Sequence, residues 1–209
     1  MTRALLIVDV QNDFTEGGAL GVDGGAAAAT RISAFLARHA GDYDVIVASR
    51  DWHHGDDDNG GHFAGAEGPD FVTTWPVHCV SGTPGAAYHP ELDTEPVDVH
   101  VRKGMGEPAY SAFEGVDDDG RSLPDVLYDR RVHAVDIVGI ATDHCVRATA
   151  LDGARAGLDV FVFDDLVAGV DAARSAAALE EIRAAGGHVG SSDVAAAIGR
   201  TAGADGAQV

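Results

Sequence analysis

The stretch VDIVGIATDHCVRATALDGARA, residues 135–156, places a short apolar run directly before a segment of helical composition. Residues 135–140 are mostly Val and Ile, which is typical of a strand buried on both faces of a parallel sheet. Residues 143–156 predict a helix that follows this strand. The same alternation recurs along the chain and predicts an α/β protein with a three-layer α/β/α architecture around a mainly parallel central sheet.

Further strands and helices are expected on both sides of this stretch. Strands are expected at the apolar runs 4–8, 45–48, 97–101, 160–163 and, more weakly, 188–190. Helices are expected over residues 25–39, 123–129, 172–185 and 193–202. The segment 51–96 is rich in Gly, Pro, His and Asp, and loops of that length inside compact domains tend to be functional. We expect a single domain over residues 1–200 and a frayed tail over 201–209.

The composition is that of a globular protein and excludes several classes of partner. Of 209 residues, 45% are hydrophobic and 23% are charged, as in ordinary folded domains. A net charge of −20 repels nucleic acid and anionic membrane surfaces. Two cysteines are too few for a disulfide framework, and the first apolar run is too short for a signal peptide or a membrane span. We therefore expect a cytoplasmic protein, either a monomer or a homo-oligomer.

Reactive side chains lie where four of the predicted strands end. Asp9 follows the first run, Asp51 lies just past the second, Lys103 just past the third and Cys145 past the fourth along the chain. The carboxyl ends of parallel strands meet at one edge of a sheet, where α/β proteins bind their ligands. We therefore expect two carboxylates, an ammonium group and a thiol to lie close together.

Cys145 is the candidate nucleophile among these residues. It falls in what reads as the first turn of a helix, where the helix dipole favours a thiolate. The adjacent His144 does not face it on a helix, so Asp9 is the candidate base. Lys103, the one lysine beside 13 arginines, would hold that carboxylate and favour the thiolate. The alternatives are a buried, unreactive cysteine and an aspartate that only caps a turn.

The long segment after the second strand carries a candidate metal site. Asp51 and His53 are two residues apart, so they point to the same side of an extended chain. Asp and His ligands suit a single divalent Zn, Fe or Mn ion. Asp51, His53 and His78 are the expected ligands, and His62 is a candidate fourth. Solvated loop histidines are the alternative. Glycine-rich phosphate loops do not follow the strands, so no nucleotide cofactor is expected.

Seven segments of the chain resemble the nicotinamidase/pyrazinamidase branch of the isochorismatase-like hydrolases. They are ALLIVDVQNDF (4–14), ASRDWHH (48–54), GHFAG (61–65), WPVHCVSGTPGA (75–86), RKG (102–104), AYSAFEG (109–115) and GIATDHCVRATALDGARAG (139–157). They occur in the order found in the family and span most of the chain. The resemblance implies hydrolysis of nicotinamide, and of pyrazinamide as a further substrate, with release of ammonia. It also implies a place in NAD salvage.

The resemblance implies a role for each of the candidate catalytic and metal-binding residues. The family's catalytic Asp, Lys and Cys match Asp9, Lys103 and Cys145, which would act through a cysteine thioester. The family's metal ligands match Asp51, His53 and His78, and a histidine that is a ligand in some members matches His62.

Residues that bind the substrate are also implied by the resemblance. They match Phe14, Trp75, Tyr110, Ala141 and His144. A cis peptide bond between Ile140 and Ala141 is implied too, and it would turn the Ala141 amide toward the oxyanion beside the Cys145 amide. Two departures from the family pattern stand out. Thr15 replaces a frequent Cys without touching the catalytic residues, and Trp52 replaces a Phe or Tyr and could alter the pocket rim.

Three other functions fit an α/β chain with some of these features. Isochorismatases cleave a vinyl ether without a catalytic cysteine, and Cys145 argues against that reaction. Carbamoyl-amide hydrolases keep the cysteine but usually lack the metal ligands, and Asp51, His53 and His78 argue against them. A metal-binding or regulatory protein would keep only the fold, and the complete set of reactive residues argues against it.

Overall fold

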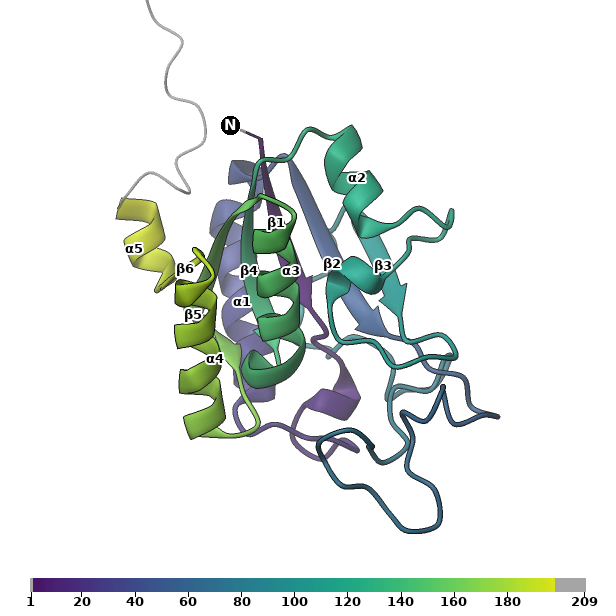
Figure 1. Cartoon of the computed structure of the whole chain (residues 1–209). Coiled ribbons are helices and arrows are strands. Elements are labelled where there is room, and N and C mark those ends of the chain that lie inside the picture. Colours follow the sequence, from purple (N-terminus) through teal and green to yellow (C-terminus); the bar gives the residue numbers. More distant parts are fainter. Residues whose placement is uncertain (1, 198–209) are drawn as a thin grey trace, which may run out of the picture.

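The computed structural model describes residues 2–197 and has a six-stranded parallel sheet at its centre, with the strand order β3-β2-β1-β4-β5-β6. The strands are β1 (Arg3–Val8), β2 (Val45–Asp51), β3 (Val99–Lys103), β4 (Ala134–Ile140), β5 (Asp159–Ala168) and β6 (His188–Gly190). Helices cover both faces of this sheet (Figure 1). The three-layer α/β/α fold predicted from the alternating pattern is confirmed.

The helices divide between the two faces of the sheet. They are α1 (Gly25–His39), α2 (Leu123–Asp129), α3 (Arg147–Arg155), α4 (Ala172–Ala184) and α5 (Ser192–Ala197). Figure 1 shows α1 behind the sheet, with α2, α3 and α4 in front of it. The α1 and α2 boundaries match the predicted ones. The predicted tail over 201–209 and the end of the predicted helix 193–202 lie outside the described residues.

Alternation along the central strands explains why both faces of the sheet are covered. Leu5 and Ile7 of β1 belong to the apolar cluster that includes Ile32 of α1. Ala4 and Leu6 point the other way, into the cluster that also contains residues of α2 and α3. Every residue of β4 is buried, as expected for a strand covered on both sides.

Strands β2 and β3 extend further than their apolar runs, and this corrects the predicted placement of two reactive residues. Asp51 and Lys103 are the last residues of these strands, and the register pairs them directly. The third strand begins at Val99 instead of residue 97. The Val97 amide donates to Thr94 in a turn at 3.2 Å instead of joining the sheet. Asp51 and Lys103 are therefore held by the sheet itself.

The segment around Cys145 differs from the predicted helix over 143–156. Residues Thr142–Val146 form a π-helical turn, and α3 begins only at Arg147. The Val146 amide bonds to the Ala141 carbonyl at 3.1 Å, five residues back, which widens the turn. Single π-helical turns occur frequently at functional sites. Cys145 therefore lies in the first turn of the helical segment, as predicted, but that turn is π-helical and α3 itself begins two residues later.

None of the helices in the described part of the chain is long and apolar enough to cross a lipid bilayer. The segment from β2 to β3 is folded back on itself by short bridges, including His53 with Val80 and Phe63 with Trp75, and the His53 ring bonds to the Gly104 carbonyl just past the end of β3. It therefore brings the histidines of the predicted metal site to the strand ends.

Candidate active site

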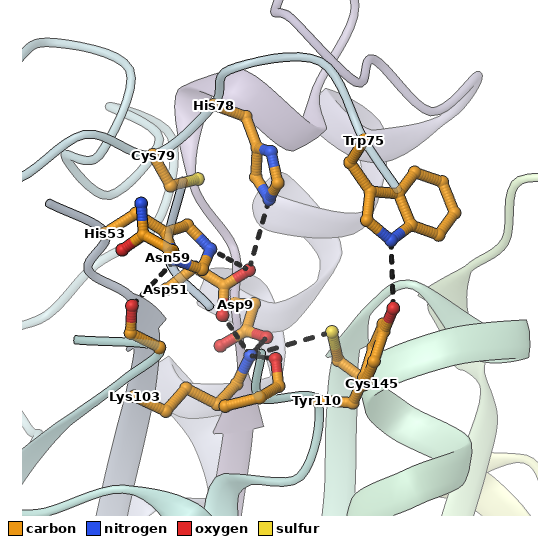
Figure 2. A network of polar contacts seen from close by, with 12 residues as sticks. Asp9, Asp51, His53, Asn59, Trp75, His78, Cys79, Lys103, Tyr110 and Cys145 are labelled. Carbon is orange, nitrogen blue, oxygen red and sulfur yellow. Dashed lines mark hydrogen bonds and ion pairs between the residues drawn. The ribbon is translucent and has the colours of Figure 1, made fainter. Parts of the chain in front are cut away.

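Four side chains from separate strand ends meet at the carboxyl edge of the sheet (Figure 2). Asp9 follows β1, Asp51 ends β2, Lys103 ends β3, and Cys145 lies in the turn after β4. All four are buried. Asp9 has a left-handed backbone conformation with φ of 47°, which is uncommon for a residue other than glycine. The structure thus brings together the four reactive residues that the sequence places after successive strands.

Lys103 is the centre of this cluster. Its Nζ lies 2.9 Å from Asp9 Oδ2 and donates a short hydrogen bond to Asp51 Oδ1. The same nitrogen lies 3.7 Å from Cys145 Sγ and 3.4 Å from the Ala109 carbonyl oxygen. One ammonium group therefore contacts both carboxylates and the thiol.

Burial and charge shift the pKa values of these groups in different directions. For Lys103, burial disfavours the charged form, but Asp51 and Asp9 outweigh it and raise the pKa well above the ordinary value. For Asp51, burial is likewise outweighed, first by the charge of Lys103 and then by the nearby His53 and His78 rings, so its pKa lies well below the ordinary value. Burial raises the pKa of Asp9, despite the opposing effect of Lys103. Asp9 is therefore the more basic of the two carboxylates.

The Cys145 thiol is not activated by its position in the way the sequence suggested. Burial raises its pKa well above the ordinary value, and a hydrogen bond to Asp9 raises it further, while Lys103 lowers it. The thiol therefore keeps its proton in the resting site, and a base must accept that proton when the sulfur attacks. Asp9 is the adjacent group able to do so.

Ser49 holds the Asp9 carboxylate and Gln11 holds the Asp51 backbone, and the sequence pattern did not single out either residue as part of the site. The Ser49 hydroxyl donates to Asp9 Oδ1 at 2.7 Å. The Gln11 amide donates to the Asp51 carbonyl at 2.9 Å and accepts from the Asp51 amide at 2.8 Å. Ser49 lies two residues before Asp51 on β2, so it points to the same side of the strand, and that spacing was the available signal.

Three buried histidines lie beside Asp51 and form a candidate metal site. Ring nitrogens of His53, His62 and His78 lie within 4.8 Å of one another. Nε2 of His53 and Nε2 of His78 each lie 3.6 Å from Asp51 Oδ2. The other ring nitrogens bond to backbone carbonyls at 2.7 Å, His53 to Gly104 and His78 to Pro76. These bonds direct both Nε2 atoms toward the carboxylate, as hydrogen bonds to the far ring nitrogen do for histidines that bind metals.

The donor atoms of this cluster fit a divalent metal ion. His53 Nε2 and His62 Nδ1 are buried without a hydrogen-bond partner among the described residues. Burial, helped by the charges of His53 and His78, lowers the pKa of His62 to about 4. His62 is therefore neutral near pH 7, which is the form that binds metals. One carboxylate and three imidazoles match the ligand set of a tetrahedral or larger Zn, Fe or Mn site.

Gly104 provides a direct test of the backbone that supports His53. Its φ is +77°, and an added Cβ would lie 2.5 Å from His53 Cε1. We expect Gly104→Ala to displace the His53 ring, so the variant should lose bound metal as well as stability. Metal content after dialysis and the free energy of unfolding measure the two effects.

Gly120→Ala is the matched control, because Gly120 has φ of +78° and nothing within 4 Å of the added atom. Both variants share the cost of a left-handed alanine, on the order of 1–2 kcal/mol. Only Gly104→Ala should lose metal. Equal metal content in the two variants would contradict the role assigned to His53.

A cavity of about 300 Å³ opens onto this cluster. The five predicted substrate-binding residues, Phe14, Trp75, Tyr110, Ala141 and His144, all line it. So do Asp51, His62, His78 and Cys145. The sequence did not identify further lining residues, including Leu20, Val22, Phe71, Val170 and Arg174. The thiol, His62 and His78 therefore face the same cavity.

Aromatic contacts shape the walls of the cavity. The Trp75 indole Nε1 donates to the Tyr110 hydroxyl at 2.9 Å (Figure 2). The Trp75 and His144 rings meet edge to face with centroids 5.2 Å apart. Ile140 and Ala141 are joined by a cis peptide bond, as the family resemblance implies. A cavity with these aromatic walls is suited to binding a flat aromatic ring.

Trp52 lies away from the cavity, so the expectation that it could alter the pocket rim is not met. It points to the opposite side of the chain from the adjacent Asp51. Its ring centroid lies 4.7 Å from the Arg50 guanidinium carbon and 5.0 Å from that of Arg102. Thr15 is buried, and its hydroxyl donates to the Asn12 carbonyl at 3.0 Å. Both departures from the family pattern therefore have local packing roles.

Comparisons with known proteins agree with this geometry. A family model described as an isochorismatase domain matches residues 3–194. The chain is 56% identical over 183 residues to a nicotinamidase/pyrazinamidase of Mycobacterium tuberculosis. That similarity covers 88% of this chain and 95% of the mycobacterial protein.

Solved structures show the same relationship. PnC1 from L. infantum in complex with nicotinate has a TM-score of 0.79 and 36% identity, over 92% of this chain and 93% of that one. A pyrazinamidase of Pyrococcus horikoshii in complex with zinc has a TM-score of 0.76 and 36% identity, over 90% and 98% of the two chains. The chain therefore belongs to the isochorismatase family, in its nicotinamidase/pyrazinamidase branch.

Proposed function

We propose that this enzyme hydrolyses nicotinamide to nicotinic acid and ammonia, with Cys145 as the nucleophile. One observation carries the proposal: the Cys145 sulfur faces the cavity and lies 3.7 Å from Lys103 Nζ, which lies 2.9 Å from Asp9. A thiol, a buried carboxylate of raised pKa and a cation between them are the parts of an activated nucleophile. The nicotinate bound by the L. infantum relative is the product of this reaction.

The first half of the reaction forms a thioester. Asp9 accepts the thiol proton as the Cys145 sulfur attacks the amide carbonyl carbon. Backbone N–H groups of Ala141 and Cys145 are proposed to stabilise the resulting oxyanion, and loss of one such donor typically costs about 3–4 kcal/mol. The protonated Asp9 then gives its proton to the leaving nitrogen. The C–N bond breaks, and ammonia departs.

The second half hydrolyses the thioester. Asp9, again a carboxylate, accepts a proton from a water molecule that attacks the thioester carbonyl carbon. The C–S bond breaks, the sulfur recovers its proton, and nicotinic acid is released. Lys103 keeps its charge throughout, because its raised pKa holds the proton on Nζ. Its role is to position Asp9 and to stabilise negative charge on the sulfur.

We propose that Asp51, His53, His62 and His78 hold one divalent metal ion. When bound, such an ion would coordinate the pyridine nitrogen and orient the ring. His62 and His78 line the cavity beside Phe14 and Trp75, which supports contact between this site and an aromatic ring. A pyrazine ring offers a nitrogen at the same position, so we propose pyrazinamide as a second substrate.

We further propose that the reaction serves NAD salvage in the cytoplasm, within a single domain over residues 1–200. The mechanism needs a free thiol, and both Cys79 and Cys145 are free. A reducing compartment keeps thiols in that state.

Ammonia release from nicotinamide tests the proposed function directly. The purified enzyme should form ammonia and nicotinic acid in equal amounts. Removal of metal with a chelator should raise KM by at least about tenfold, equal to about 1.4 kcal/mol of lost binding, because the ring loses its anchor. Steady-state kinetics before and after chelation, with metal analysis of each sample, measure both effects.

Readdition of metal is the control for this experiment and should restore the original KM. No ammonia from the metal-loaded enzyme would contradict the proposed reaction. An unchanged KM in a sample shown to be free of metal would contradict the orienting role alone.

A further inference from the structure

The cavity has a buried inner end and an exposed outer end. Cys145, at the inner end, is only 7% exposed, whereas Phe71 and Val170 are 52% and 50% exposed. A carboxamide that reacts at Cys145 therefore occupies the inner end. The outer end of the cavity therefore faces any substituent on the side of the substrate ring opposite the carboxamide.

Arg174 is the one arginine or lysine among the described residues that line this cavity. Its side chain is 53% exposed and lies in the first turn of α4. A helix N-terminus disfavours a cation, and two carboxylates offset this cost. Arg174 Nε lies 3.6 Å from Asp143 Oδ2 and 4.0 Å from Asp171 Oδ1. These contacts are ion pairs longer than a hydrogen bond.

The partners of Arg174 leave its donor groups free. Asp143 accepts the Val170 amide at 2.9 Å on one oxygen and the Asp171 amide at 3.2 Å on the other. Asp171 caps α4 by accepting the Arg174 amide at 2.8 Å. Within the described part of the chain, the guanidinium donates no hydrogen bond to any of these groups. It therefore offers a fork of N–H donors to a ligand.

The cavity is also large enough for a ring substituent, and its lining includes polar side chains. Pockets of about 300–1,000 Å³ hold drug-sized ligands, so a cavity of about 300 Å³ exceeds the need of one ring with one carboxamide. His144, which also lines the cavity, has a buried Nε2 that makes no hydrogen bond among residues 2–197 and lies 3.9 Å from Asp143 Oδ2. A polar ring substituent would thus meet two nitrogen-bearing side chains in the cavity lining, Arg174 and His144.

We propose that the outer end of the cavity binds a carboxylate through Arg174, so that the enzyme also hydrolyses pyridine carboxamides that carry a second, anionic ring substituent. This inference rests on the proposed function, since it uses the same reaction at Cys145. The chain has a net charge of −20, which repels an anionic substrate, so a local cation is needed for such a substrate to bind. Neutral nicotinamide has no such need.

The test compares nicotinamide with 5-carbamoylpyridine-3-carboxylate, which keeps the pyridine nitrogen and the carboxamide and adds one carboxylate. The measured quantity is the kcat/KM for the acidic substrate divided by that for nicotinamide. We expect Arg174→Gln to lower this ratio by about tenfold or more, the effect typical of a hydrogen bond to a charged group. Arg174→Lys keeps the charge and should retain much of the ratio.

Arg183→Gln is the matched control, because it removes the same charge from the same helix. Arg183 is half-exposed, pairs with Glu180 at 2.6 Å and lies outside the cavity lining, so this variant should leave the ratio unchanged. The inference is overturned if the wild-type enzyme hydrolyses nicotinamide but not the acidic substrate. It is also overturned if Arg174→Gln and Arg183→Gln give the same ratio. Failure to hydrolyse nicotinamide at all would instead reject the proposed function, and this inference with it.

Discussion

Cys145→Ala should lower kcat for nicotinamide hydrolysis by at least about 10⁴-fold, because the proposed reaction passes through a bond to this sulfur. The variant keeps Asp9 and Lys103, 2.9 Å apart, together with the histidine cluster. Water activated by Asp9 without a thioester is a poor replacement, since the sulfur divides one difficult step into two easier ones. Ammonia release measured at saturating nicotinamide, with the metal site loaded, gives the size of the loss.

Two controls separate chemistry from folding in this experiment. Cys79→Ala removes the other buried thiol, which is absent from the cavity lining, and should keep most of the activity. Binding of nicotinate to Cys145→Ala should persist, because the walls formed by Phe14 and Trp75 are intact. Substantial ammonia release by a Cys145→Ala protein that still binds nicotinate would exclude a thioester.

The convergence of Asp9, Asp51, Lys103 and Cys145 could be predicted because it depends on topology alone. Each residue lies at or just past the end of an apolar run, and parallel strands bring such positions to one edge of a sheet. The histidines could be predicted as candidate ligands by their type. Their common meeting point depends on how residues 52–98 fold over the strand ends, and the local pattern of that segment is irregular.

Other features of the site depend on tertiary packing and could not be predicted. The wide turn at Thr142–Val146 is defined by backbone bonds from Val146 to Ala141 and from Arg147 to Thr142, each five residues back, and no residue type requires it. The raised pKa of Cys145 arises chiefly from burial, which opposes the effect predicted from a helix terminus. Arg174 comes from α4, far along the chain, and nothing in its neighbours marks it as part of a cavity wall.

Lys103→Met should destabilise the protein by about 3–5 kcal/mol and remove activity, because it leaves buried carboxylates without their shared cation. Asp9 and Asp51 are both buried and both pair with Lys103 Nζ. A metal ion beside Asp51 compensates only that carboxylate, so Asp9 stays unpaired. The free energy of urea unfolding, compared with that of the wild-type protein, measures the effect.

The stability lost in Lys103→Met should increase with pH. Burial already raises the pKa of Asp9, and removal of Lys103 raises it further. A carboxyl group whose pKa is higher in the folded state than in the unfolded state lowers stability once it ionises. This loss begins as the pH rises above the unfolded-state pKa, about 3.9, and is complete above the folded-state pKa. The difference in unfolding free energy between Lys103→Met and wild type should therefore be smaller at pH 5 than at pH 8.

The double variant Lys103→Met with Asp9→Asn is the control for lost packing. It should recover part of the stability of the wild-type protein but none of its activity. A double variant as unstable as Lys103→Met would show that lost packing of the lysine chain, and not unpaired charge, causes the effect.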